Sequence, residues 1–147
     1  MRIYLAAAMT NAGRDLDAIK TIFACLEEDG HDVPTWHVAD PLGREDDQAI
    51  TDAELAHRDL EWVAGCDALV AEVSTPSHGV GVEVTAALTA GKPVLLAHRR
   101  GAPVSRLLLG MPRVEVLAYG GAADAREGVR RFLARLAPRP EAGRPAT

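Results

Sequence analysis

Short hydrophobic runs of strand length alternate along the chain with longer segments that have helical periodicity. The runs that predict strands are 2–7, 32–36, 68–73, 93–97 and 114–118. The segments that predict helices are 14–29, 51–64, 82–90, 103–110 and 122–136. Strands that alternate with helices are typical of a parallel sheet that helices cover on both faces.

Local signals support individual elements of this pattern. In segment 14–29 the apolar positions recur at i, i+3, i+4 and i+7, which is the period of an amphipathic helix. Thr51 and Glu54 have the spacing of a capping box, which predicts that a helix begins there. Pro34 has no backbone N–H to donate, so the strand predicted at 32–36 is expected at an edge of the sheet.

The predicted fold class is α/β: a single doubly wound, flavodoxin-like domain with a five-stranded parallel sheet and helices on both faces. The 147 residues correspond to one domain. This domain is expected to cover 1–137, followed by a disordered tail at 138–147. Right-handed crossovers favour the flavodoxin-like strand order 2-1-3-4-5. In that order a ligand binds beyond the carboxyl ends of the first and third strands, next to loops 8–14 and 74–81.

Composition and charge exclude several classes of protein. The net charge of −5 argues against binding a nucleic acid polymer across the whole surface. No apolar run approaches the roughly 18 residues that span a membrane. Cys25 and Cys66 form no CxxC pair and no Cys/His cluster, so neither a disulfide framework nor a metal site is expected. We expect a reduced, cytoplasmic protein without a metal or another cofactor.

The loop at 74–81 has the most unusual sequence in the chain. Gly79 and Gly81 let the backbone approach a ligand closely, and the unpaired N–H groups at the start of the next helix favour an anion such as phosphate. Ser77 adds a hydroxyl donor. An ordinary tight turn is the alternative, and the dinucleotide-binding fingerprint does not fit because a third glycine is missing. His78 is expected to be a solvated loop residue rather than an acid–base catalyst.

Two carboxylates stand near this loop in the predicted fold. Glu83 is expected in the first turn of the following helix, where the helix dipole keeps a carboxylate ionised. It is either a surface residue or a nucleophile or electrostatic partner at the mouth of the site. Asp59 borders the apolar face of helix 51–64, so its charge is expected either to be paired or to serve a catalytic role. A surface salt bridge with Arg58 is the alternative. The acidic run 45–47 is expected to be a solvated loop, unless it covers the site.

The sequence around these carboxylates resembles the nucleoside 2-deoxyribosyltransferase superfamily, and most closely its branch of nucleoside 5′-monophosphate N-glycosidases. The resemblance covers residues 2–136 in element order. Its most specific stretches are 59–62, 66–83 and 91–95, with Tyr4 and 36–40 also fitting the family pattern.

The resemblance implies a role for each of four residues. Glu83 is the nucleophile that attacks the anomeric carbon, and water then hydrolyses the glycosyl-enzyme intermediate. Asp59 is the second carboxylate, which guides proton transfer to the leaving base. Tyr4 hydrogen-bonds near Glu83 and the sugar, and His37 lines the base pocket. A Tyr4 hydroxyl at Glu83 would crowd a ribose 2′-hydroxyl, so a preference for 2′-deoxynucleotides is expected.

The resemblance also implies which residues bind the 5′-phosphate and that the protein is a dimer. Ser77, Gly79 and the backbone around Gly81 are implied to hold the phosphate. Ser105 resembles a phosphate-binding serine that the neighbouring subunit donates. The resemblance therefore implies a homodimer whose sites are shared between subunits.

The loop after the first strand departs from the family pattern. Close deoxynucleotide hydrolases carry a serine and an arginine there, whereas Ala8 of this chain has no side-chain donor. Thr10, Asn11 and Arg14 are the candidate substitutes. Met9 is expected to narrow or reshape the base pocket. The departure bears on phosphate specificity more than on glycosidic chemistry.

The function expected from the resemblance is hydrolysis of the N-glycosidic bond of a (2′-deoxy)nucleoside 5′-monophosphate to free base and (deoxy)ribose 5-phosphate. A nucleoside deoxyribosyltransferase is the alternative within the enzyme class. A non-catalytic module that senses a nucleotide on the same fold is the alternative outside it. The presence of both Glu83 and Asp59 favours an enzyme, because a sensor needs neither carboxylate.

Overall fold

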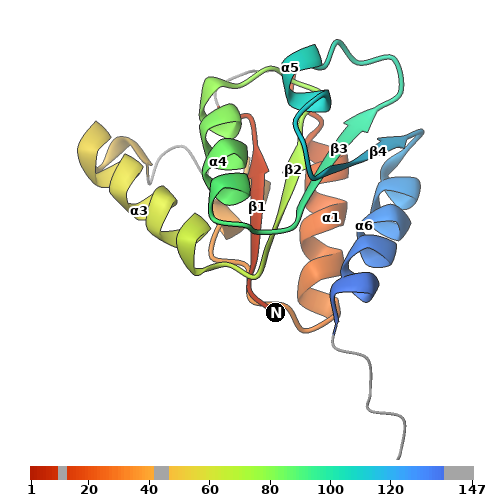
Figure 1. The fold of residues 1–147 in the computed structure, drawn as a ribbon, viewed down its shortest axis with the longest axis horizontal. Coiled ribbons are helices and arrows are strands. Elements are labelled where there is room, and N and C mark those ends of the chain that lie inside the picture. The colour runs from red at the N-terminus through yellow and green to blue at the C-terminus, as the bar shows by residue number, and fades with distance from the viewer. Residues whose placement is uncertain (10–12, 42–46, 138–147) are drawn as a thin grey trace, which may run out of the picture.

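The computed structural model describes residues 1–9, 13–41 and 47–137, and this part of the chain forms a parallel sheet of four strands (Figure 1). The strands are β1 (Ile3–Ala7), β2 (Ala68–Glu72), β3 (Val94–Arg99) and β4 (Val114–Tyr119). They are hydrogen-bonded in the order β1-β2-β3-β4, with every pair parallel. Their carboxyl ends therefore meet at one edge, which is where ligands bind in open α/β sheets.

Helices cover both faces of this sheet, as predicted (Figure 1). The helices α1 and α6 pack on one face, and α3 and α4 lie on the other. The longer helices are α1 (Leu16–Glu28), α3 (Asp52–Gly65), α4 (His78–Thr89) and α6 (Ala122–Leu136). The short ones are the 3-10 helix η1 (Trp36–Ala39) and α5 (Arg106–Leu109).

The side chains of β1 alternate between the two helical layers. Ile3, Leu5 and Ala7 belong to the core under α1 and α6, whereas Tyr4 and Ala6 belong to the core under α4. All five residues are buried, so the strand reads as a continuous apolar run even though its side chains point alternately to opposite faces. This alternation places Tyr4 on the same side of the sheet as α4.

The predicted strand at 32–36 is wrong. Its only ladder contact is an isolated parallel bridge between Arg2 and Asp32, and a 3-10 helix follows at once. Pro34 has no N–H for a ladder. The Thr35 hydroxyl oxygen accepts the Leu5 N–H at 3.0 Å, so a side chain takes the place of a neighbouring strand. Among the described residues the sheet therefore has four strands rather than five. β1 is an edge strand, and the four strands keep their predicted relative order.

The start of α4 is the second correction. The helix begins at His78 rather than at residue 82, because Ser77 caps it: its hydroxyl oxygen accepts the Val80 N–H at 3.3 Å. The loop after β2 is correspondingly shorter than predicted. Gly81 lies inside the helix, and Glu83 lies in the second turn rather than the first.

The remaining predictions of elements are close to the structure. The side chains of Thr51 and Glu54 form the predicted capping box at the start of α3, and α6 has the predicted bounds. The predicted tail at 138–147 lies outside the described residues, as do Thr10 and Asn11. No helix in the described part is long and apolar enough to cross a membrane. A cluster of three or more potential metal ligands is also absent from that part.

Candidate active site

A cavity of about 890 Å³ opens where the carboxyl end of β1 meets α3 and the start of α4. This volume is in the range of small-molecule sites. The predicted site residues that line it are Met9, Asp59, Ser77, Gly79 and Glu83. The cavity lies beside the carboxyl ends of the first strand and of the strand at 68–72, next to the start of α4, as the predicted strand order required.

Glu83 meets Tyr4 beside this cavity. The Tyr4 hydroxyl donates a hydrogen bond of 2.8 Å to Glu83 Oε1 across the gap between α4 and β1. Burial raises the pKa of Glu83 to about 7, and the negative charge of Asp59 adds to this rise, whereas the Tyr4 hydrogen bond lowers it. The helix dipole was predicted to keep Glu83 ionised; its pKa is instead raised, because desolvation outweighs the stabilisation of its charge.

Tyr4 is held as a permanent hydrogen-bond donor. Only 2% of the residue is exposed. Burial, and then the negative charges of Glu83 and Asp59, raise the pKa of its hydroxyl far above the usual value. The hydroxyl therefore keeps its proton throughout the physiological pH range and orients one oxygen of Glu83.

Asp59 reaches the cavity from α3 with one oxygen already engaged. Its Oδ1 accepts from Arg58 Nε at 2.9 Å and contacts the terminal nitrogen of the same guanidinium at 2.8 Å. The salt bridge with Arg58, predicted as the structural alternative, is thus present on a residue that also lines the cavity. Among the described residues, Oδ2 has no protein partner, so it is the oxygen left for a ligand.

The first turn of α4 leaves room for a ligand against its backbone. A methyl group added at Gly81 would meet no atom within 4 Å, and one added at Gly79 would meet only the Ser77 hydroxyl at 3.8 Å. Both glycines have ordinary helical backbone, so it is space at the helix surface that they supply. The N–H groups of His78 and Gly79 have no acceptor within the helix, which suits an anion.

Comparison with known proteins places this chain in a family. A family described as nucleoside 2-deoxyribosyltransferase matches residues 3–127. The chain belongs to the nucleoside 2-deoxyribosyltransferase family. It is 36% identical over 136 residues to a protein of Methanosarcina mazei with the provisional name 2′-deoxynucleoside 5′-phosphate N-hydrolase 1, covering 91% of this chain and 84% of that protein.

Two further relatives extend the comparison. The family member described here is 37% identical over 101 residues to the 5-hydroxymethyl-dUMP N-hydrolase of Rattus norvegicus, covering 66% of this chain and 60% of that protein. It also superposes on the structure of the CMP N-glycosidase of Clostridium botulinum with a TM-score of 0.67 and 20% identity, covering 90% of this chain and 99% of that chain. The structural likeness shows a shared fold.

Two predicted ligand-binding residues lie behind the cavity of this nucleoside 2-deoxyribosyltransferase family member. The His37 ring is buried next to the Trp36 and Trp62 rings, with both centroid distances 6.0 Å, and His37 is not among the residues that line the cavity. Arg14 donates to the carbonyl oxygens of Val38 and Asp40, each at 2.9 Å. The structure thus uses Arg14 to hold the 38–40 segment.

Arg14 still touches the cavity wall indirectly, through Met9. Its guanidinium lies 3.6 Å from Met9 Sδ, and Met9 lines the cavity as predicted. The other two candidate substitutes from this loop, Thr10 and Asn11, lie outside the described residues.

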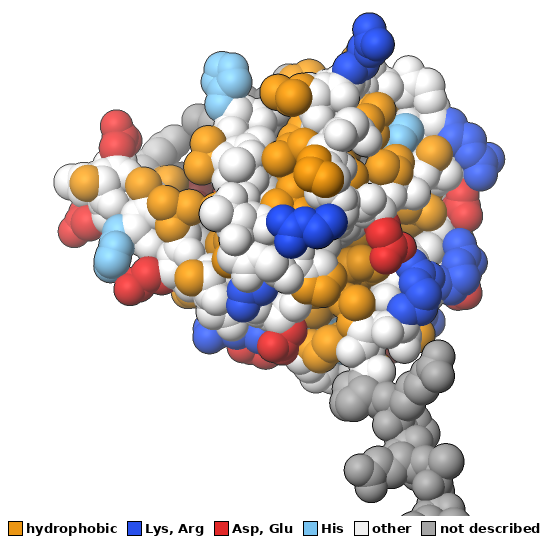
Figure 2. Space-filling view, viewed as in Figure 1, with side chains coloured by type: hydrophobic (Ala, Val, Ile, Leu, Met, Phe, Trp, Pro, Cys, Tyr) orange, Lys and Arg blue, Asp and Glu red, His pale blue; other side chains and the backbone are white. Residues whose placement is uncertain are grey.

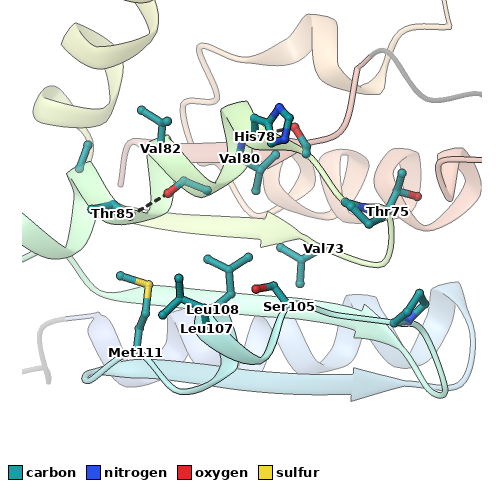
Figure 3. A pocket seen from close by; sticks show the side chains of 15 residues that line it. Val73, Thr75, His78, Val80, Val82, Thr85, Ser105, Leu107, Leu108 and Met111 are labelled. Carbon is teal, nitrogen blue, oxygen red and sulfur yellow. Dashed lines mark hydrogen bonds between the residues drawn. The ribbon is translucent and has the colours of Figure 1, made fainter.

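Ser105 lines a different cavity from Glu83. This second cavity, of about 860 Å³, lies between α4 and α5, and its walls are mainly apolar (Figure 3). Ser105 caps α5 without a side-chain hydrogen bond to the helix and is exposed. The two cavities meet at the start of α4, where Ser77 and His78 line both of them. Within one chain, therefore, Ser105 shares the second cavity with Ser77 and Gly81, whereas Gly79 and Glu83 line the first.

Two residues beside Asp59 have larger roles than the sequence predicted. Asp47 belongs to the acidic run expected to be a solvated loop unless it covers the site, and it lines the cavity and accepts from Arg58 at 2.9 Å. Arg58 was considered only as a surface partner of Asp59, although it contacts both aspartates and lies over the Trp62 ring. The signal for both was the adjacency of Arg58 and Asp59, but nothing in the sequence indicates that 47 lies beside 58.

Proposed function

We propose that this protein hydrolyses the N-glycosidic bond of a 2′-deoxynucleoside 5′-monophosphate and releases the free base and deoxyribose 5-phosphate. The observation that carries the proposal is the cavity in which Glu83, oriented by the Tyr4 hydroxyl at 2.8 Å, is accompanied by Asp59. Most glycosidases use a pair of carboxylates as their catalytic groups. The names of the relatives in Methanosarcina mazei and Rattus norvegicus support the same class of substrate.

In the proposed mechanism Glu83 acts as the nucleophile. Its ionised carboxylate attacks the anomeric carbon, the bond from that carbon to the base nitrogen breaks, and the electron pair leaves with the base. Asp59 guides a proton to the departing base. Water then attacks the anomeric carbon of the glycosyl–Glu83 ester, loses a proton, and frees the carboxylate. The Tyr4 hydroxyl stays protonated and holds Glu83 in place during both steps.

The 5′-phosphate is assigned to the start of α4. The N–H groups of His78 and Gly79 and the Ser77 hydroxyl converge there, and the positive end of the helix dipole favours a dianion. The space beside Gly79 lets the phosphate approach the backbone. Asp59 and Glu83, further along the same cavity, are then left for the glycosidic bond.

Tyr4→Phe is expected to shift the acid limb of the pH profile to higher pH. Glu83 must be ionised to attack, so wild-type kcat/KM should rise with pH up to about 7 and then level off. Because the Tyr4 hydrogen bond lowers the pKa of Glu83, its loss raises that pKa. Removing a hydrogen bond to a charged group is expected to lower kcat/KM about tenfold or more near neutral pH. The measurement is kcat/KM from pH 5 to 9.

The same variant tests the proposed sugar preference. If the Tyr4 hydroxyl excludes a ribose 2′-hydroxyl from Glu83, wild type prefers deoxynucleotides and Tyr4→Phe narrows the ratio of deoxy to ribo kcat/KM. A wild-type preference for ribonucleotides, or an unchanged ratio in the variant, would contradict this account of the sugar. The role of Glu83 would be unaffected by that result.

We also propose that the protein is a homodimer in which Ser105 of one subunit completes the phosphate site of the other. Val82 and Leu107, which are exposed at 58% and 80%, line the same cavity between α4 and α5 as Ser105. Figure 2 shows hydrophobic side chains gathered on the face that carries these helices. Exposed apolar patches of this kind are typical of protein interfaces.

Mixing two impaired variants tests the shared site. Subunits with Glu83→Gln lack the nucleophile, and subunits with Ser105→Ala lack the donated phosphate ligand. A mixed dimer contains one site in which Glu83 and Ser105 are both intact, so activity should rise after subunits exchange. The control is each variant incubated alone under the same conditions. No gain, with exchange shown by native mass spectrometry, would contradict shared sites.

The test of the function itself is a panel of substrates. The protein is incubated with ribo- and deoxynucleoside 5′-monophosphates and with the matching nucleosides, and free base is measured by chromatography. Release of base from a deoxynucleotide supports the proposal. Formation of a new nucleoside when a second base is added would indicate a deoxyribosyltransferase instead. Tight binding without base release would indicate a nucleotide sensor.

A further inference from the structure

Arg58 joins two separate walls of the active-site cavity. Its side chain is 25% exposed and lies between Asp59 on α3 and Asp47, which are each 18% exposed. One terminal nitrogen contacts Asp47 Oδ1 at 2.9 Å and Asp59 Oδ1 at 2.8 Å, while Nε donates to the same Asp59 oxygen at 2.9 Å. Both aspartates line the cavity, so one guanidinium sets the relation between them.

This arrangement is not the ordinary consequence of neighbouring positions on a helix. Side chains at i and i+1 of a helix point in different directions, so Arg58 must fold back to reach Asp59. The aromatic ring of Trp62 holds it there, because the guanidinium carbon lies 4.8 Å from the ring centroid. Trp62 is itself packed near the buried His37 ring. The guanidinium is therefore held by Trp62, one helical turn further along α3, and by Asp47 from outside the helix.

The contacts leave Asp59 with one defined orientation. Both Arg58 nitrogens lie on Oδ1, so Oδ2 is the oxygen available to a ligand among the described groups of the cavity. Arg58 also offsets negative charge where Asp47, Asp52, Asp59 and Glu83 all line one space. A planar guanidinium suits this task because it engages several oxygens in fixed directions, which an ammonium group does not do.

We propose that Arg58 is a positioning residue: it directs Asp59 Oδ2 at the leaving base and ties the cavity wall at 47–50 to that carboxylate. The inference rests on the proposed N-glycosidase function. Since Asp47 precedes α3 in the chain, the Arg58 contact links the position of this wall to the orientation of Asp59. Arg58 acts through Asp59 and makes no contact with the bond that breaks.

The experiment compares Arg58→Gln in the wild-type and Asp59→Asn backgrounds. Alone, Arg58→Gln should lower kcat on the natural nucleotide about tenfold or more, because a small misplacement of a catalytic group has effects of this size. On a sugar phosphate with an activated leaving group such as 4-nitrophenol, the loss should be much smaller. In the Asp59→Asn background the same substitution should have little further effect on kcat, since residues that act as one unit are non-additive.

Further variants separate positioning from folding. Arg58→Lys should recover only part of the activity, because it keeps the charge and loses the fork of donors. Asp47→Asn should raise KM more than it lowers kcat, since it weakens the contact of the wall with Arg58 and keeps the contact of Arg58 with Asp59. Arg130→Gln is the matched control: it removes the ion pair of similar exposure with Asp29 on the opposite face of the sheet, and should leave both kcat and KM as in wild type.

A second readout does not depend on turnover. In a crystal structure of Arg58→Gln, Asp59 should turn away from the cavity and the 47–50 wall should move outward. An unchanged Asp59 rotamer, or a full extra loss in the Asp59→Asn background, would overturn the inference. If wild type releases no base from any nucleotide, the proposed function fails. In that case the crystal structure still decides whether Arg58 positions Asp59.

Discussion

Replacing Glu83 with glutamine is expected to lower base release from the natural nucleotide by about a thousandfold or more, because the amide is nearly isosteric but cannot attack as an anion. The Gln side chain still offers Tyr4 an acceptor in place of Oε1. Single-turnover chromatography of free base measures the loss. Substantial activity in the folded variant would contradict the assignment of Glu83 as the nucleophile.

The thermal stability of the same variant supplies an independent check. Burial raises the pKa of Glu83 from an ordinary value of 4.5 to about 7, so between these values the folded state binds more protons than the unfolded state. The contribution of Glu83 to stability therefore falls as pH rises through this window. Because glutamine does not titrate, the Tm of Glu83→Gln relative to wild type should rise from pH 4.5 to 7. A difference that is flat with pH would show that the carboxyl titrates at its ordinary pKa.

Asp59→Asn is expected to produce the second-largest loss of activity. Asparagine keeps the shape of the side chain and still offers an oxygen to Arg58, but it neither accepts nor donates a proton as a carboxyl does. General acid–base catalysis contributes about 10² to 10⁴-fold, so kcat should fall within this range for a base that is a poor leaving group.

The leaving group separates proton transfer from other roles of Asp59. For the analogue with 4-nitrophenol as the leaving group, which departs without a proton, Asp59→Asn should lose far less activity. The measurement is the ratio of single-turnover rates for the two substrates in wild type and variant. An equal loss on both substrates would show that Asp59 acts on the charge or shape of the cavity instead.

The elements of the fold were predictable to the extent that local patterns decide them. β1 and α6 formed as expected, because the strand is a continuous apolar run and the helix has a strong amphipathic period. The capping box at Thr51 and Glu54 likewise marks its own helix start. The strand predicted at 32–36 failed because its hydrogen bonds depend on partners elsewhere. Thr35 supplies the acceptor for the Leu5 N–H from its side chain.

The sequence also predicted several side chains of the site. It did not predict the pKa of Glu83. Tyr4 and Glu83 are 79 positions apart, and the pairing of β1 with β2 together with the placement of α4 brings them into hydrogen-bond contact. The pKa of Glu83 follows from how deeply α4 buries it, and burial is a property of the whole packed structure. A local rule, the helix dipole, predicted the opposite direction.

Short-range periodicity was enough to predict the alternation of strands and helices, and chain connectivity was enough to predict the order of the four strands. Packing between distant segments places Ser105 in a different cavity from Glu83 and brings Asp47 to Arg58. Contacts between distant segments depend on how helices pack against a sheet. This packing depends on side chains from many segments at once, so no single stretch of sequence predicts it.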